Sequence, residues 1–344
     1  MTELDPGPDG DWTRPGVYEV AAGVYRMPLP LPNDGLRAVN VYVLVEPDGL
    51  VLVDAGWAIA EARETLSRGL AALDAGIADI RRFLVTHAHR DHYTLAVTLR
   101  REFGTSVALG AGEKPSLQAL NNPHHPPLGQ QVQLLRELGA QELADRIAGA
   151  AHHDRDLSIW QYPDEWLEEG PLQLPGRLLQ IVPTPGHTAG HVVLHDSGNS
   201  LLFAGDHVLP TITPSIGLEP VVVQDPLGAF LRSLERVRRM PDARLLPAHG
   251  PVTGSVHARV DELVAHHGRR LDQTEDAVRN GATTAYEAAG QLRWTRREHT
   301  LDSLDPFNAM LAVAETGAHL DLLVAQSRLT KTVVDGIRRY TTGD

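Results

Sequence analysis

Three histidines and an aspartate lie within six residues of this chain, directly after an apolar run with the character of a strand. The run is Phe83–Val85, and the polar residues are His87, His89, Asp91 and His92. Side chains of an extended segment alternate in direction, so His87 and His89 share a face, about 7 Å apart at roughly 3.3 Å per residue. Asp91 and His92 follow where the chain turns into a helix. A lone His-x-His pair is typical of a solvated loop, but this grouping predicts a metal site.

Three further apolar runs end in the same way, with glycine or proline beside one imidazole or carboxylate. The sequence TPGHTAGH places His187 after a stiff turn, FAGDH places Asp206 after a second run, and LLPAHGP places His249 after a third. Strands of one sheet that end at the same edge bring such side chains together. The four strand ends therefore predict one centre built from residues remote in sequence.

The chain has no cysteine, which excludes disulfides, thiolate catalysis and metal sites that use sulfur. Any metal must therefore be held by nitrogen and oxygen. Such ligands suit zinc first, with manganese or iron as alternatives. The net charge of −13 argues against a general affinity for nucleic acid, and no apolar run approaches the length of a membrane span.

The N-terminal segment is acidic, rich in glycine and proline, and without the features of a secretory signal. We therefore expect a disordered lead-in over residues 1–15 and a cytoplasmic protein. The 344 residues suffice for one large domain and a smaller one. We expect the large domain to span residues 16–258 and the smaller one residues 259–344.

Apolar runs alternate with helical patterns in the first third of the chain. We expect strands at 41–45, 50–53, 83–86 and 105–109, and helices at 59–73 and 95–103. This alternation predicts a layered α/β fold with helices covering the sheet. Residues 112–170 break the pattern and indicate a helical insertion packed over the sheet. Strands resume at 178–182.

Helices dominate the smaller domain. We expect two helices joined near Gly281, a third helix over residues 306–326, and a closing hairpin around Asp335 and Gly336.

The chain closely resembles the metallo-β-lactamase-fold hydrolases over roughly residues 16–255. The family's motifs are complete and in order, as Asp54-Ala55-Gly56, His87-Ala88-His89-Arg90-Asp91-His92, Gly186-His187, Gly205-Asp206 and His249-Gly250. The resemblance implies an αββα sandwich, class α/β, with the site at one edge. It also implies two divalent metal ions. The smaller domain would then be a winged-helix-like α+β appendage.

The resemblance assigns metal ligands residue by residue. It puts the first ion on three histidines, His87, His89 and His187. It puts the second ion on Asp91, His92 and His249, with Asp206 bridging the two. Asp54 would orient the histidine loop, as ligating imidazoles generally require.

One departure concerns the substrate. Many relatives have a small residue or glycine soon after the last histidine of the first motif, where this chain has Tyr93-Thr94-Leu95. The ligands are kept, but the relatives' substrate pocket is not carried over.

Two divalent ions about 3.5–4 Å apart can hold a bridging hydroxide and stabilise a developing oxyanion, so no side-chain nucleophile is needed. The hydroxide would attack a carbonyl or a phosphorus. Asp91 is placed to bind metal and to handle a proton. His191 is a candidate for donating to the oxyanion or leaving group, and the alternative is a supporting or merely exposed histidine. His207 is expected to support a ligand or the fold.

Other histidines and aromatics are weaker candidates. The pairs His124-His125 and His152-His153 could form a further metal site, but we expect solvated loops. Trp160, Tyr162 and Trp166 form either an apolar lid or ordinary packing of the insertion. The stretch PTITPSIGLEP after Asp206 is a candidate pocket wall.

The smaller domain resembles the winged-helix appendage of lactamase-beta-2-like proteins, a branch that includes reported ribonucleases and enzymes acting on esters or thioesters. A third helix that reads nucleic acid needs cationic side chains. Residues 307–326 contain neither lysine nor arginine, and residues 261–344 hold 10 basic and 13 acidic residues, a net of −3. Nucleic acid is therefore not expected as a partner.

We expect a binuclear metal-dependent hydrolase acting on a small ester-type molecule, namely a thioester, lactone or ester. The alternative is a phosphodiesterase or ribonuclease that uses the same metal site. A non-catalytic binding module is a third hypothesis, which the full ligand set disfavours. We expect no membrane partner, and exposed helices on the appendage suggest a homodimer.

Overall fold

The computed structural model describes residues 3–4, 10–32, 35–150, 156–295 and 298–343. Its strands form two large sheets and one hairpin within these ranges. The larger sheet has eight strands in chain order, β1 (Glu3–Leu4), β2 (Tyr18–Ala21), β3 (Val24–Pro30), β4 (Ala38–Glu46), β5 (Gly49–Val53), β6 (Ile80–Val85), β7 (Ser106–Gly110) and β8 (Glu165–Leu167). Strands β2 to β5 are antiparallel neighbours, and β5 to β8 run parallel.

The second sheet has five strands, in the order β13 (Arg244–Pro247), β12 (Leu201–Gly205), β11 (Val192–Asp196), β10 (Leu178–Pro183) and β9 (Gly170–Gln173). Strands β12 and β13 are parallel, and the other pairs are antiparallel. Every residue of β11 and β12 is buried. Continuous burial means that both faces of this sheet are covered.

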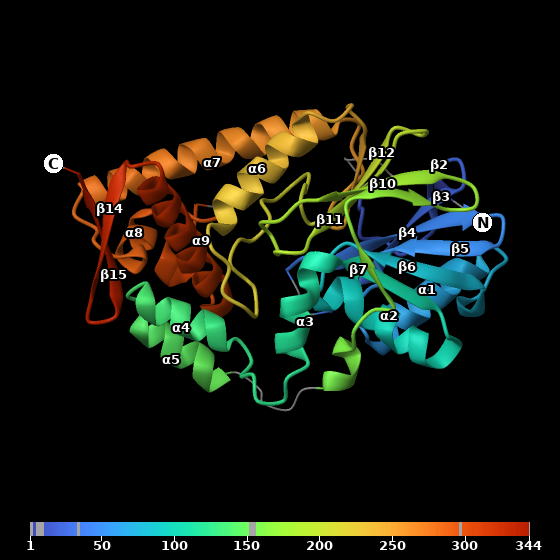
Figure 1. Ribbon diagram of the computed structural model, residues 1–344, viewed down its shortest axis with the longest axis horizontal. Helices are drawn as coiled ribbons and strands as arrows, with labels where there is room; N and C mark the ends of the chain where they lie inside the picture. The colour runs from blue at the N-terminus through green and yellow to red at the C-terminus, as the bar shows by residue number, and fades with distance from the viewer. Residues whose placement is uncertain (1–2, 5–9, 33–34, 151–155, 296–297, 344) are drawn as a thin grey trace.

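Helices cover the outer faces of both sheets (Figure 1). In the main domain and its insertion they are α1 (Ala60–Ala71), α2 (Arg90–Phe103), α3 (Lys114–Leu120), α4 (Gly129–Glu137), α5 (Gln141–Ala150) and α6 (Pro226–Arg238). Leu66 and Phe83 pack between the first two helices and the larger sheet, Leu44 and Phe203 pack between the sheets, and Phe230 packs between α6 and the second sheet. These three apolar layers confirm the predicted αββα sandwich.

The carboxyl ends of several strands meet at one edge of the sandwich. Strands β5, β6 and β7 are parallel to one another, and β10, β12 and β13 share one direction in the second sheet. Ala248, just after β13, joins the sheets because its N–H donates to the Gly205 carbonyl at 3.0 Å and its carbonyl accepts from the Asn40 N–H at 2.7 Å. The loops after β6, β10, β12 and β13 therefore gather at this edge.

The insertion differs from the prediction in two ways. Strand β8 pairs in parallel with β7, so this part belongs to the larger sheet and does not lie outside it. The longest helical stretch of the insertion, over residues 129–150, is made of two helices separated at Gly139, whose φ of +85° ends α4. Leu135 of α4 and Leu143 of α5 share a core with Met310 of the C-terminal domain. Helices α4 and α5 therefore pack on that domain, whereas Leu117 of α3 belongs to the core of the larger sheet.

The C-terminal domain is built from α7 (Val256–Arg279), α8 (Ala285–Gln291), α9 (Pro306–Ala325) and the hairpin of β14 (Leu329–Val334) and β15 (Ile337–Thr342). This is the expected order of helices and hairpin. Helix α7 runs without a break through the boundary expected at residue 259, because Val256 and Val260 belong to the same core as the second sheet. Helix α9 is buried along most of its length. Among the described residues, no helix combines the length and the apolar character needed to cross a bilayer.

The expected disordered lead-in falls only partly within the described residues. Strand β1 pairs in parallel with β2, and the Arg26 guanidinium donates to the Trp12 carbonyl at 2.8 Å. Asp11 accepts from the Thr13 N–H at 3.1 Å. The prediction of disorder is therefore wrong for these residues, and residues 1–2 and 5–9 lie outside the described ranges.

Candidate metal centre

The six-residue histidine motif lies where β6 gives way to α2. His87 follows the strand, His89 occupies the N-cap position of α2, and Asp91 lies in the first helical turn. The structure gathers all seven predicted ligands at this edge in two adjoining groups, which we call the edge centre. In each group one nitrogen or carboxylate oxygen per residue lies within 4.8 Å of the others, in the sets His87, His89, His187 and Asp206, and Asp91, His92 and His249.

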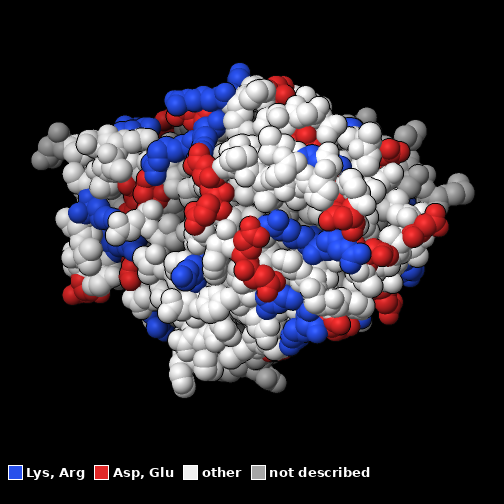
Figure 2. Space-filling model, turned by 45° about the vertical axis from the view of Figure 1, so that its right-hand side comes forward, with Lys and Arg blue, Asp and Glu red and all other residues white. Residues whose placement is uncertain are grey.

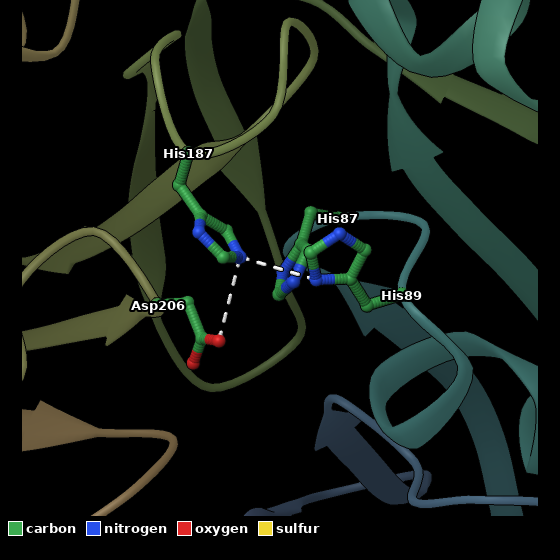
Figure 3. Close-up of side chains that lie close together, drawn as sticks. All are labelled: His87, His89, His187 and Asp206. Carbon is green, nitrogen blue, oxygen red and sulfur yellow. Dashed lines mark hydrogen bonds and ion pairs between the residues drawn. The ribbon is translucent and has the colours of Figure 1, made fainter. Parts of the chain in front are cut away.

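In the first group the side chains converge from three different loops (Figure 3). His187 Nε2 lies 3.1 Å from His89 Nδ1 and 3.4 Å from Asp206 Oδ2. The His87 ring centroid lies 4.6 Å from that of His89 and 4.9 Å from that of His187. Three imidazoles and one carboxylate thus surround a single point.

The second group adjoins the first through the Asp206 carboxylate. His249 Nε2 lies 3.3 Å from Asp91 Oδ2, and His92 Nε2 lies 3.5 Å from the same oxygen. Asp206 Oδ1 lies 3.4 Å from His249 Nε2, while its other oxygen faces His187. The Asp206 carboxylate therefore presents one oxygen to each group, which is the geometry of a bridging ligand.

Main-chain carbonyls fix which nitrogen each histidine offers. His187 Nδ1 donates to the Ser215 carbonyl and His249 Nδ1 to the Ala38 carbonyl, both at 2.8 Å. Because a carbonyl only accepts, each Nδ1 carries the proton and each Nε2 presents its lone pair to the centre. His89 is turned the other way, since its Nε2 lies 3.4 Å from the Leu218 carbonyl and its Nδ1 faces His187. Such partners orient metal-binding imidazoles.

Asp54 orients two ligands at once. It accepts from His92 Nδ1 at 2.9 Å and from the Thr86 N–H at 2.8 Å. The Thr86 hydroxyl lies 3.0 Å from Asp54 and 3.0 Å from His87 Nδ1, so it can accept from the imidazole while donating to the carboxylate. Asp54 adopts a φ of +60°, uncommon for a residue other than glycine. The geometry supports the role expected of Asp54, and Thr86 is a contributor that sequence motifs did not mark.

Four buried atoms of the edge centre have no hydrogen-bond partner among the described residues. They are His87 Nε2, His92 Nε2, His249 Nε2 and Asp206 Oδ1. A buried polar atom left without a partner costs about 1–3 kcal/mol. Divalent cations between the two groups would serve all four atoms, so the donor set and its geometry fit a metal centre.

The two groups differ in how they hold protons. Burial and the surrounding imidazoles lower the pKa of His87 well below its ordinary value, and burial lowers the pKa of His89 to about 3. Burial alone would also lower the pKa of His92, but Asp91 and the other nearby carboxylates raise it to about 10. Carboxylates raise the pKa of His249 in the same way. Without metal the first group is deprotonated at pH 7, whereas metal uptake by the second group displaces protons.

Glycine at one strand end allows the close packing of this edge. Gly205, just before Asp206, has a φ of +50°, and a Cβ at this position would lie 2.6 Å from His191 Nε2 and 2.7 Å from the Thr86 hydroxyl. No larger side chain fits without moving one of these groups. The glycine therefore lets Asp206 approach the histidine motif.

His191 and His207 lie behind the ligands. His191 is fully buried, its Nε2 accepts from the Asp206 N–H at 3.1 Å, and its Nδ1 lies 2.8 Å from the Thr184 hydroxyl. With both nitrogens occupied, this geometry favours the alternative in which His191 supports a ligand over donation to a leaving group. His207 packs behind His191, with its ring centroid 5.1 Å from that of Phe230.

The segment after Asp206 forms one wall of the edge centre, as the carbonyls of Ser215 and Leu218 show. Glu219 of this segment is a buried carboxyl group, and a second one, Glu113, lies near enough to add to the rise that burial causes in the pKa of Glu219. Glu113 accepts from the Thr188 hydroxyl, and Glu219 accepts from the Ser116 hydroxyl at 3.1 Å. Burial raises the pKa of Glu113 to about 7 and that of Glu219 to about 8. Sequence reasoning missed both residues, because a single glutamate in a helical or loop segment has no local signature.

The remaining candidates lie away from the centre. His124 is exposed, as expected for a solvated loop, and His152 and His153 lie outside the described residues. Trp160 and Trp166 pack on the core beneath α2, and Tyr93 of that helix donates to the Gln161 carbonyl at 2.6 Å. This favours ordinary packing of the insertion for the two tryptophans, whereas Tyr162 is exposed and its role stays a prediction.

Comparison with known proteins agrees with this geometry. Residues 34–249 match the model of the metallo-beta-lactamase superfamily. The chain is 25% identical over 322 residues to the probable metallo-hydrolase YqjP of Bacillus subtilis (strain 168), covering 89% of this chain and 92% of that protein.

Two solved structures resemble the whole chain. The metallo-beta-lactamase family protein TTHA1429 from Thermus thermophilus has a TM-score of 0.77 at 28% identity, covering 94% of this chain and 100% of that one. A beta-lactamase domain protein from Burkholderia ambifaria has a TM-score of 0.74 at 26% identity, with 99% of both chains covered. The chain therefore belongs to the metallo-beta-lactamase superfamily and is a metal-dependent hydrolase with a His/Asp metal-binding cluster.

Proposed function

We propose that this protein is a binuclear metal-dependent hydrolase that cleaves a small ester-type substrate, namely a thioester, a lactone or an ester. The observation that carries the proposal is the set of four unpartnered buried atoms shared between two adjoining groups joined by Asp206. Zinc suits these ligands first, with manganese or iron as alternatives. When bound, two such ions lower the pKa of water and polarise the substrate oxygen.

The side chains indicate where a substrate approaches. His89 and Asp91 are partly exposed, whereas the other five candidate ligands are buried. A substrate would therefore enter from the side of His89 and Asp91. Asp91 is the carboxylate nearest this opening and, at its Oδ atoms, would take up and release the proton that hydrolysis moves. Asp54 and the main-chain carbonyls hold the imidazoles still while this happens.

The C-terminal domain supports a small substrate over RNA. Helix α9, which would be the reading helix of a winged-helix domain, is buried and cannot enter a groove. Two of the three cations of the hairpin are ion-paired, since Lys331 and Arg338 bind Asp321 at 2.8 and 3.0 Å. The third, Arg339, donates to the Thr283 hydroxyl at 2.8 Å. On the face that Figure 2 shows, basic and acidic side chains alternate and form no continuous basic track. Phosphate recognition needs unpaired cations along a path.

The proposal is tested by assaying the zinc-loaded protein on acyl-thioester, lactone and ester substrates beside single-stranded RNA, with Asp206→Ala as the control. We expect metal-dependent turnover of at least one ester-type substrate and none in the control. Cleavage of RNA that falls steeply with salt, without turnover of any ester-type substrate, would overturn the proposal in favour of a phosphodiesterase.

A further inference from the structure

A second group of metal-ligand side chains lies in the C-terminal domain, outside the edge centre. His267 of α7 meets Glu315 and His319 of α9, and one ligand atom of each lies within 4.8 Å of the others. Glu315 and His319 are four residues apart, so they lie on the same face of α9. We call these three residues the helix-pair cluster.

The hydrogen bonds of His319 show which atom it presents. Its Nδ1 donates to the Glu315 main-chain carbonyl at 2.8 Å, so Nδ1 carries the proton and Nε2 presents a lone pair. That Nε2 lies 3.2 Å from His267 Nδ1. Two nitrogens bound tetrahedrally to one zinc ion at about 2.0–2.1 Å are about 3.3 Å apart. The two imidazoles are therefore already spaced as ligands of one ion.

One group of the cluster lacks a partner that the ion would supply. His267 is fully buried, and with Nδ1 as its ligand atom the proton lies on Nε2, which has no hydrogen-bond partner among the described residues and is not served by the ion. Within the same residues, no hydrogen bond or ion pair satisfies the Glu315 carboxylate, and burial raises its pKa. Burial also lowers the pKa of His267 to about 2 and that of His319 to about 4. Both imidazoles are therefore neutral at pH 7, the form that binds metal.

Arg270 is the nearest cation to the cluster, and its contacts lie elsewhere. Its guanidinium stacks on Trp294 at 4.0 Å from the ring centroid, and Nη1 donates to the Arg293 carbonyl at 3.0 Å. Burial is the larger influence and raises the pKa of Glu315, and the charge of Arg270 opposes that rise. No ion pair joins Arg270 to Glu315 among the described residues, so Arg270 does not prevent the carboxylate from binding a metal ion.

We propose that His267, Glu315 and His319 hold one divalent cation, zinc first, which fastens α7 to α9 independently of the edge centre. Two imidazoles and one carboxylate form a donor set that zinc commonly takes in proteins, with one position left for water. The ion would link helices that are otherwise joined by apolar packing and by the contact between His267 and His319. It would act on the stability of the C-terminal domain and not on the reaction.

The test uses the full-length protein, stripped of metal and then titrated with zinc chloride. The variants are His319→Asn and the isosteric Glu315→Gln, with His266→Asn as the matched control because His266 is adjacent to His267 but outside the cluster. Native mass spectrometry counts the zinc ions per chain, and competition with a chelating dye gives their affinity. Only variants whose circular dichroism matches the wild type are compared.

We expect His319→Asn and Glu315→Gln each to bind one zinc ion fewer per chain than the wild type at stoichiometric zinc. The zinc-induced rise in Tm should shrink in both, whereas His266→Asn should behave as the wild type. Hydrolytic activity should stay within about threefold, since the cluster lies outside the reaction. Equal zinc content in Glu315→Gln and the wild type, with affinities within threefold, would overturn the proposal.

Discussion

At the edge centre the ligands follow strand ends, on loops or in the first turn of α2, whereas in the helix-pair cluster they lie on the faces of two helices. The first arrangement leaves His89 and Asp91 partly exposed, so solvent and substrate reach the ligands. The second buries both of its imidazoles completely. The comparison teaches that the scaffold decides what histidines and carboxylates do. On partly exposed strand ends they are accessible to a substrate, and between two buried helices they are suited to stabilising the fold.

Removing the bridging carboxylate should have the largest effect. Asp206 presents one oxygen to each group of the edge centre, so Asp206→Ala should lower kcat/KM by about 10³-fold or more, the scale of several kcal/mol that metal ions supply. His319→Asn should change kcat/KM by less than about threefold. Comparable losses of kcat/KM in Asp206→Ala and His319→Asn, measured on the same substrate, would contradict the assignment of catalysis to the edge centre alone.

The orienting role of Thr86 can be isolated from ordinary packing. Thr86→Val removes the hydroxyl between Asp54 and His87, and it should weaken metal binding or activity by about 10–100-fold. Thr105→Val is the matched control, because Thr105 is also buried but bonds to the Ile80 carbonyl at the far end of β6. Zinc affinity and kcat/KM are measured for both variants. A loss in Thr86→Val alone would support the orienting role of Thr86, and equal losses in the two variants would refute it.

A pH profile of the reaction rate distinguishes the two roles considered for His191, which are support of Asp206 and donation of a proton. If His191 supports Asp206, His191→Gln should lower zinc content and reduce kcat about tenfold, while the alkaline limb of the rate profile keeps its position. Loss of that limb at unchanged zinc content would instead identify His191 as a proton donor.

The smallest effect concerns stability in the wall of the edge centre. Burial raises the pKa of Glu219 to about 8, above its unfolded value of 4.5, so its stabilising contribution is full below pH 4.5 and is lost as pH rises through about 8. The difference in free energy of unfolding between Glu219→Gln and the wild type should therefore grow in favour of the variant from pH 5 to pH 9, on the order of 2 kcal/mol. Urea unfolding at both pH values measures the gain, and Glu102→Gln is an exposed control with a lowered pKa. A gain that does not change with pH would contradict this reading of Glu219.

The edge centre could be predicted from the sequence because its ligands follow strand ends, and His187, Asp206 and His249 each stand beside a glycine. A motif such as FAGDH combines an apolar run, a backbone with positive φ at Gly205 and a carboxylate, and all three signals are local. The sandwich follows from the same runs and from the helical periodicity between them.

Features that depend on distant partners were not predictable in this way. Strand β8 is three residues long and is defined by its pairing with β7, and α4 and α5 were placed over the sheet because nothing local shows that they pack on α9. The helix-pair cluster is hidden for the same reason. His267 lies 52 residues before His319, and only the crossing of two helices brings them together.

An anomalous difference map, recorded at the zinc absorption edge from crystals of the zinc-loaded protein, tests the central claim most directly. We predict two peaks at the edge centre about 3.5–4 Å apart, one among His87, His89 and His187 and the other between His92 and His249, with Asp206 touching both. A single peak, or ions bound elsewhere while these side chains keep to hydrogen bonds among themselves, would contradict the account.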